Sequence, residues 1–267
     1  MDRIRHRIGA VKYLNTKPLI EGLAQENGVD LVLDLPSRLA DRLLAHTIDV
    51  GLLPIVDFLA HPEFGLIPGI SISCAGPVLS VQLFSRVPLE KVLWIDADVG
   101  SHTSIALCQI LIQKTLGLLP QMRPFPLEAD PNHSKADAVL LIGDRALSAS
   151  LPDFPFSFDL GWEWQKLTGL PMVFAVWATR PKVDVQALEC LLKKAKQRGL
   201  ANLPRIAHQA SQELNLDGAI CRKYLEHIIR YDLGPKEVLS VSEFARLAQN
   251  LNLLPQRINT SHASPFG

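Results

Sequence analysis

Short apolar runs alternate with helix-like segments through the first part of this chain. The strand-like runs lie at 7–14, 30–35, 49–53, 66–72 and 78–84, and the helix-like segments at 18–25 and 37–46. Apolar strands that are covered by helices on both faces are typical of parallel sheets. The alternation therefore predicts an α/β fold with mainly parallel sheets and helices on both faces.

The same alternation starts again near residue 91. A strand over 92–96 precedes a helix over 101–116, in which Ile105, Cys108 and Ile112 share one face. Further strands are predicted at 121–127, 136–142 and 171–178, and helices from 185 onward, at 217–231 and at 242–251. The prolines in 151–158 remove backbone donors, so this stretch is predicted to be irregular.

Two successive series of this kind predict two lobes. Lobe 1 comprises residues 1–89 and 179–267, so that the helical C-terminal segment packs on it, and lobe 2 comprises residues 90–178. The chain then crosses between lobes near 85–91 and 178–183, and we expect these crossings to act as hinges. A single doubly wound domain gives the same order of elements and is the alternative.

Charge and hydropathy exclude several classes of protein. The 267-residue chain has 27 Lys and Arg against 27 Asp and Glu, which excludes the electrostatic footprint of a general nucleic-acid binder. Apolar runs stay well short of the ~20 residues that a membrane span needs. Residues 1–8 are basic, but Gly9–Asn15 do not continue them as a signal peptide would. We therefore predict a cytoplasmic protein with no nucleic-acid or membrane partner.

Signatures of metal, nucleotide and hydrolase chemistry are missing. The four cysteines are far apart in sequence, which favours reduced thiols over a disulfide framework or a zinc site. The chain has no GxGxxG, GxxxxGK[ST], GxSxG or HExxH motif. Its eight histidines, from His6 to His262, show no close pairing, so no metal site is predicted.

Polar side chains follow two of the predicted strands, where ligands of open α/β sheets usually bind. Tyr13, Asn15 and Thr16 come after the first strand, and Ser101, His102, Thr103 and Ser104 begin the 101–116 helix. A helix N-terminus offers free N–H groups and partial positive charge, enough to hold a carboxylate. Two such sites would suit a dicarboxylate. Ordinary helix capping is the alternative at both.

Two further polar positions are candidates. Ser73, Gly76 and Ser80 belong to the polar stretch 71–80, which joins two strand-like runs through a Gly-Pro turn. Serines in such a stretch either bind a ligand or bond their own backbone. Asp144 follows a buried strand and is a candidate catalytic acid or base, although capping a helix or pairing with Arg145 would also explain it.

Several segments together resemble the chorismate dehydratase family, which opens the futalosine route to menaquinone. The segments are Val11–Leu19, Ile48–Pro54, Ser73–Val81, Ser101–Ser104 and Val173–Ala178. The likeness covers residues 1–180 well and the helical tail loosely. It implies a two-lobed fold like the type II periplasmic binding proteins, conversion of chorismate to 3-[(1-carboxyvinyl)oxy]benzoate and water, and no cofactor.

Within that resemblance, Asn15, Ser80 and Ser101–Ser104 match positions expected at the substrate cleft. The sister enzyme 1,4-dihydroxy-6-naphthoate synthase shares the fold but typically has a Ser-Pro motif in place of Tyr13–Thr16, so Asn15 favours the dehydratase. A non-enzymatic binding protein or sensor for a small carboxylate is the other alternative. The proton acceptor stays open between the enolpyruvyl carboxylate of the substrate, Asp144 and His102, and the oligomeric state is not predicted.

Overall fold

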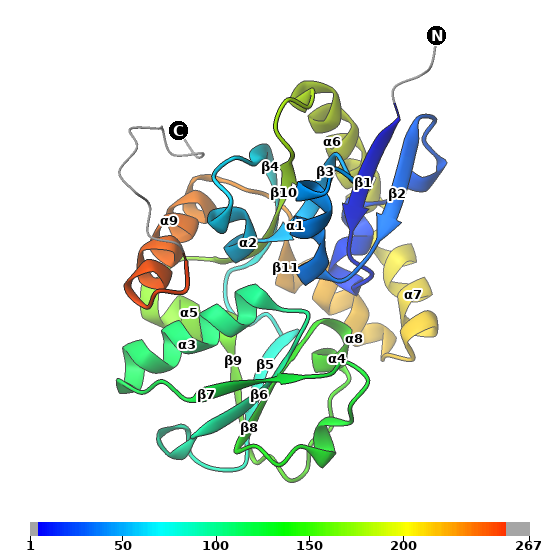
Figure 1. The fold of residues 1–267 in the computed structure, drawn as a ribbon. Coiled ribbons are helices and arrows are strands. Elements are labelled where there is room, and N and C mark those ends of the chain that lie inside the picture. Colours follow the sequence, from blue (N-terminus) through cyan, green and yellow to red (C-terminus); the bar gives the residue numbers. More distant parts are fainter. Residues whose placement is uncertain (1–4, 255–267) are drawn as a thin grey trace.

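The strands form two separate sheets in the computed structural model, which describes residues 5–254 (Figure 1). Residues 1–4 of the basic N-terminal segment and His262 lie outside the described residues. The order in the first sheet is β11-β4-β10-β3-β1-β2 and in the second β7-β6-β8-β5-β9. Two sheets exclude the single doubly wound domain, and the predicted two-lobed architecture is confirmed.

The first sheet contains β1 (His6–Ala10), β2 (Val29–Leu33), β3 (Val50–Pro54), β4 (Gly65–Cys74), β10 (Met172–Thr179) and β11 (Ile229–Arg230). The second contains β5 (Val81–Ser85), β6 (Trp94–Asp98), β7 (Gln121–Phe125), β8 (Ala138–Ile142) and β9 (Phe156–Asp159). All five residues of β3 and of β8 are buried, as their unbroken apolar sequences predict.

Both sheets are mixed, so the prediction of mainly parallel sheets is wrong. Strand β1 runs parallel to β2 and β3, and β6 runs parallel to β7 and β8. Strand β10 is antiparallel to β3 and β4, and β5 is antiparallel to β8 and β9. The cause is the path of the chain, since β5 and β10 are the strands that enter a sheet directly after a crossing from the other lobe.

The chain crosses between lobes through residues 75–80, from β4 to β5, and through 160–171, from β9 to β10. The sheets therefore correct the predicted boundaries and hinge positions. Residues 85–91 connect β5 to β6 within the second lobe, and 178–183 lead from β10 into a first-lobe helix. The apolar sequence of a strand does not indicate which sheet the strand joins. For this reason the sequence analysis assigned β5 and β10 to the wrong lobes.

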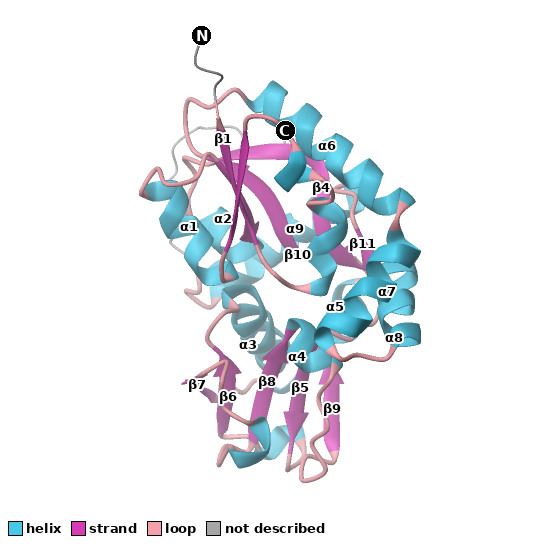
Figure 2. Cartoon of the chain, turned by 90° about the vertical axis from the view of Figure 1, so that its right-hand side faces the viewer, coloured by secondary structure: helices cyan, strands magenta, loops and turns pink. Residues whose placement is uncertain are grey.

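Helices cover both sheets (Figure 2). They are α1 (Pro36–Leu44), α2 (Ile55–Ala60), α3 (His102–Leu116), α4 (Gly143–Leu147), α5 (Leu160–Thr168), α6 (Val185–Ala201), α7 (Leu203–Leu214), α8 (Gly218–Lys223) and α9 (Pro235–Asn250). Helices α3, α4 and α5 lie on the side of the second sheet that faces the first lobe. In the part of the chain that the structure describes, each helix is too short or too polar to span a bilayer.

Three predicted elements differ in detail. The 18–25 helix is replaced by 3₁₀ turns at Leu14–Leu19 and Leu23–Gln25, because Gly22 between them adopts a φ of +74°. The 217–231 helix is divided into α8, a π turn at Tyr224–Ile228, and β11. The stretch predicted to be irregular contains β9, which Pro155 precedes and which lies at the sheet edge, where a lost donor is tolerated.

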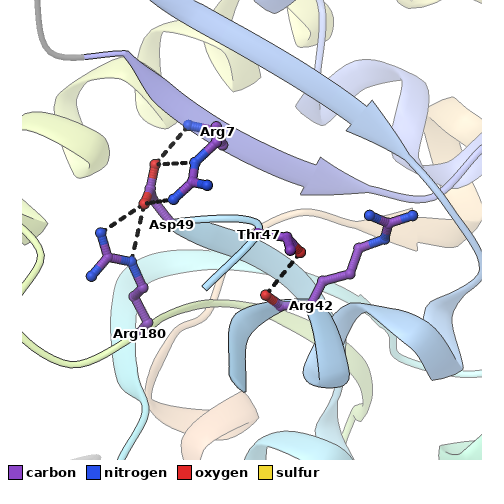
Figure 3. A network of polar contacts seen from close by, with 5 residues as sticks. All are labelled: Arg7, Arg42, Thr47, Asp49 and Arg180. Carbon is purple, nitrogen blue, oxygen red and sulfur yellow. Dashed lines mark hydrogen bonds and ion pairs between the residues drawn. The ribbon is translucent and has the colours of Figure 1, made fainter. Parts of the chain in front are cut away.

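A buried carboxylate joins three strands of the first sheet (Figure 3). Asp49, at the start of β3, accepts hydrogen bonds from the Arg7 backbone N–H at 2.8 Å and from the side chains of Arg7 and Arg180. Thr47 Oγ1 donates to the Arg42 carbonyl at 3.1 Å and holds the turn that leads from α1 into β3. Burial alone would raise the pKa of Asp49, but the two arginines more than offset it, so this pKa lies below its ordinary value.

Candidate active site

A cavity of about 80 Å³ lies between the two lobes. Its walls are Val11, Tyr13, Asn15, Pro36, Leu52, Pro54, Ile72, Phe174 and Ala175 of the first lobe, Val78 and Ser80 of the crossing, and Val81, Ser101, Thr103, Ser104, Ile142 and Gly143 of the second lobe. All of these described lining residues are uncharged, so the polar contacts that they offer come from hydroxyls, amides and backbone groups.

Asn15 lies on the turn that follows β1, within the 3₁₀ helix Leu14–Leu19. The residue before this helix is Tyr13, whose side chain makes no capping hydrogen bond, and neither Asn15 nor Thr16 occupies the N-cap position, so the capping reading of these two residues is wrong. The Asn15 amide instead forms hydrogen bonds with two other side chains. Its Nδ2 donates to the Tyr224 hydroxyl at 3.1 Å, and its Oδ1 accepts from Thr16 Oγ1 at 3.3 Å.

Tyr224 is a site residue that the sequence did not indicate. It is 1 % exposed, and its hydroxyl donates to Ser80 Oγ at 2.6 Å. The residue therefore connects Asn15 and Ser80, two predicted site residues that lie far apart in the chain. Burial raises its pKa well above the ordinary value, so the phenol is protonated at neutral pH. Its place in an apolar helical pattern gave no signal beyond that of a core residue.

Ser80 is held at the cavity by an unusual turn in the first crossing. Leu79 has a φ of +62°, and the Ser80 N–H donates to the Val78 carbonyl at 2.7 Å. Such γ-turns are strained and need support from their surroundings. The Asp159 carboxylate gives this support, because it accepts from the N–H groups of Val78 and Leu79 at 2.7–3.0 Å. Asp159 was also missed by the sequence analysis.

The start of α3 forms the second-lobe wall of the cavity. Ser101 is the N-cap and accepts from the Ser104 N–H at 3.3 Å, so the capping reading holds for this residue while its side chain also lines the cavity. Thr103 reaches across to the first lobe, where its Oγ1 donates to the Phe174 carbonyl and accepts from the Val56 N–H, both at 3.4 Å. The predicted contact of this helix with a carboxylate stays a prediction.

His102 is on the outer side of the same helix start and does not line the cavity. Its Nδ1 lies 2.8 Å from the Asp57 carboxylate on α2. The hydrogen bond to Asp57 raises the pKa of His102, although burial partly opposes it. The histidine therefore links the two lobes outside the cavity.

Asp144 also links the lobes instead of lining the cavity. Its Oδ1 accepts from the Leu14 N–H at 2.9 Å, and Arg145 pairs with Asp98, so the alternative in which Asp144 pairs with Arg145 is wrong. Burial raises the pKa of Asp144 despite the Leu14 bond and the positive charge of Lys17. The residue before it, Gly143, lines the cavity and packs against the Tyr13 ring.

The remaining predicted residues lie near the cavity but not on its walls. Thr16 is buried behind Asn15, and Ser73 Oγ donates to the Arg230 carbonyl at 3.3 Å between β4 and β11. Gly76 lies in the first crossing with a φ of +126°. Within residues 5–254, no three His, Cys, Asp or Glu side chains are grouped as metal ligands.

Solved structures of other proteins share this architecture. The chain superposes on a protein from Archaeoglobus fulgidus with a TM-score of 0.71 at 11% identity, covering 95% of this chain and all of that one. For the periplasmic aliphatic sulphonate binding protein of Escherichia coli the TM-score is 0.62 at 12% identity, with 96% and 90% covered. These similarities confirm the predicted periplasmic-binding-protein-like fold.

Sequence comparison goes further than the fold. A chorismate dehydratase of Thermus thermophilus is 31% identical, over 89% of this chain and 93% of that protein. A chorismate dehydratase of Campylobacter jejuni is 27% identical, over 92% of this chain and 98% of that protein. Residues 6–250 match the profile of a family described as menaquinone biosynthesis. The chain therefore belongs to the menaquinone biosynthesis family, as its motifs indicated.

Proposed function

We propose that this protein is a chorismate dehydratase, a carbon–oxygen lyase that forms 3-[(1-carboxyvinyl)oxy]benzoate and water from chorismate in the futalosine route to menaquinone. The observation that carries the proposal is the cavity between the lobes, where Asn15 and Ser80 meet through Tyr224. The similarity to two chorismate dehydratases over nearly the whole chain supports it.

The reaction needs positioning more than a strong catalyst. The hydrogen on the ring carbon that bears the enolpyruvyl ether is vinylogous to the ring carboxylate, so its removal gives a delocalised dienolate. That dienolate expels the neighbouring hydroxyl, which leaves as water with the removed proton, and the ring becomes aromatic. Fixed neutral donors that stabilise the growing negative charge are sufficient for such a step. Asn15, Ser80 and the α3 start offer donors of this kind.

We propose that the enolpyruvyl carboxylate of the substrate takes the proton. Two observations support this. The described residues that line the cavity include no carboxylate or imidazole. The two protein groups considered as bases, Asp144 and His102, are bonded to Leu14 and Asp57 outside it. No cofactor enters this scheme.

The decisive experiment mixes the purified protein with chorismate and follows ring absorbance and mass. Loss of one water with a gain of benzenoid absorbance supports the dehydratase, and Asn15→Ala should remove most of the turnover while the thermal midpoint changes little. Normal turnover in the folded Asn15→Ala variant would contradict the role of this residue. Near wild-type turnover is expected for Asp144→Asn and His102→Gln, and a large loss in either would identify it as the base.

A non-enzymatic carboxylate-binding protein is the second candidate, favoured by the likeness to periplasmic binding proteins. The same experiment separates the two candidates. Chorismate that binds, as calorimetry measures, but is recovered unchanged after long incubation would replace the enzyme by a binding protein.

A further inference from the structure

A buried hydrogen-bond chain ends at the cavity wall. It runs from Asn15 Nδ2 to the Tyr224 hydroxyl over 3.1 Å and from that hydroxyl to Ser80 Oγ over 2.6 Å. Asn15 and Ser80 both line the cavity, whereas Tyr224 lies behind them. The three residues come from the turn after β1, the C-terminal helical segment and the first crossing between lobes.

The chemistry of the groups fixes the direction of the chain. The Oδ1 of Asn15 accepts from Thr16, which orients the amide so that its Nδ2 faces Tyr224. An amide nitrogen only donates, so the phenol oxygen accepts from Asn15 and its single hydrogen goes to Ser80. The Ser80 oxygen is then an acceptor for Tyr224, and the hydrogen of Ser80 is left for a group in the cavity.

We infer that Tyr224 is a positioning residue that makes Ser80 a hydrogen-bond donor to the negative charge that develops on the substrate. The inference rests on the proposed function, since it concerns the carboxylate or dienolate of that reaction. Hydrogen bonds in a directed chain polarise one another, so the Tyr224 bond strengthens the donation by Ser80. A donor already oriented needs no rearrangement when charge develops.

The packing of Tyr224 is consistent with a fixed donor. Its side chain is fully buried, and the π turn Tyr224–Ile228 contacts the 3₁₀ helix that carries Asn15. Its raised pKa keeps the phenol hydrogen in place across the neutral range. Tyr224 itself does not touch the cavity, so it acts through Ser80 and Asn15.

The test is Tyr224→Phe, which retains the ring and removes the hydroxyl. Loss of a donor that contacts the charge directly costs about 10²–10³-fold in kcat, so loss of its support should cost about 10–100-fold. KM should change less than about threefold, because the weakened contact matters most in the transition state. A merely structural role would lower the thermal midpoint and leave the turnover of the folded fraction unchanged, and that result would overturn the inference.

Tyr231→Phe is the matched control. Tyr231 is 4 % exposed, and its hydroxyl has no hydrogen-bond partner among the described residues. Tyr231→Phe therefore removes a hydroxyl from a residue of the first lobe that is buried like Tyr224, but it breaks no hydrogen bond between described residues. Wild-type kcat is expected, and a loss as large as that of Tyr224→Phe would show that a general packing defect explains both.

A double variant tests the connection to Ser80. When Ser80→Ala is already present, adding Tyr224→Phe should lower kcat by less than about twofold, because the donor that Tyr224 supports is already absent. Independent, multiplying losses would overturn the inference. If the wild-type protein leaves chorismate unchanged, the proposed function fails, and chorismate affinity decides instead. Non-additive weakening of binding by the same two substitutions would then support the donor assignment, and unchanged binding would refute it.

Discussion

The Asp49 network allows the contribution of a buried carboxylate to stability to be separated from catalysis. Asp49→Asn keeps the size of the side chain but removes the charge that neutralises Arg7 and Arg180 (Figure 3). Breaking a buried pair by removing one partner costs about 3–5 kcal/mol. The arginine side chains are 38% and 27% exposed, so water solvates the freed guanidinium groups and the low end, about 3 kcal/mol, is expected.

For a chain of this length, about 3 kcal/mol lowers the thermal midpoint by about 6 °C. The measurement is calorimetry or circular dichroism on heating, with Glu243→Gln as control. Glu243 pairs with Arg246 on the surface, and such pairs contribute at most about 1 kcal/mol. Turnover at 25 °C should be unchanged in both variants, because neither Asp49 nor Glu243 lines the cavity.

The lowered pKa of Asp49 also predicts how the stability difference between wild type and Asp49→Asn depends on pH. A carboxyl with a lower pKa in the folded state stabilises the protein above its unfolded pKa of ~3.9, and this stabilisation is lost as pH falls through the folded value. The difference between wild type and Asp49→Asn should therefore be constant from pH 7 to about 5 and shrink below about pH 4. This reasoning would be refuted if Asp49→Asn lost no more stability than Glu243→Gln, or if its loss of stability grew as the pH fell.

Four further outcomes are expected. Thr103→Val keeps the shape of the side chain and removes the hydroxyl at the α3 start, which bonds Val56 and Phe174 of the first lobe. This change should cost ~1–3 kcal/mol in chorismate affinity or turnover, whereas Lys17→Ala should have little effect. The reverse would show that charge from the first lobe holds the anion. Gly143→Ala should weaken chorismate binding, because φ is +60° and a Cβ would lie 2.9 Å from the Tyr13 ring; wild-type affinity would show that the ring moves freely. Asp159→Ala should lower kcat about tenfold or more by releasing the turn before Ser80, and an effect on the thermal midpoint alone would contradict this. Small-angle scattering should give a smaller radius of gyration with product bound, and an unchanged radius would exclude closure of the lobes.

The sequence predicted best the residues that follow strands. Tyr13, Asn15, Ser101 and Thr103 line the cavity because β1 and β6 end at the edges that face the other lobe. That rule uses only strand order and the position of the next helix, both of which apolar periodicity indicates. Ser80 was found through its motif, since nothing in the local pattern predicts the γ-turn that holds it.

Tyr224 and Asp159 were missed for different physical reasons. Tyr224 contacts the wall residues Asn15 and Ser80 only because the C-terminal helical segment folds back onto the first lobe. Its position in the apolar pattern of the sequence resembles that of any buried helix residue. Asp159 ends β9, in a stretch whose prolines predicted irregular structure, and caps α5 through the Trp162 N–H. The direction of the strands could not be predicted from the sequence either, because an apolar run has the same sequence whether its neighbour is parallel or antiparallel.

The place of β10 between β3 and β4 affects how the chain folds as it is synthesised. Strands β5 to β9 emerge consecutively, so the second sheet has all of its partners once residue 159 is made. In the first sheet, β3 pairs with β1 on one edge, but its other edge and strand β4 have no partner until β10 is made, and β10 ends at residue 179. At ribosomal rates of about 5–20 residues per second, that wait lasts roughly 5–20 s. We therefore expect the inserted lobe to fold first on the ribosome, while β4 and one edge of β3 in the outer lobe stay open to chaperones.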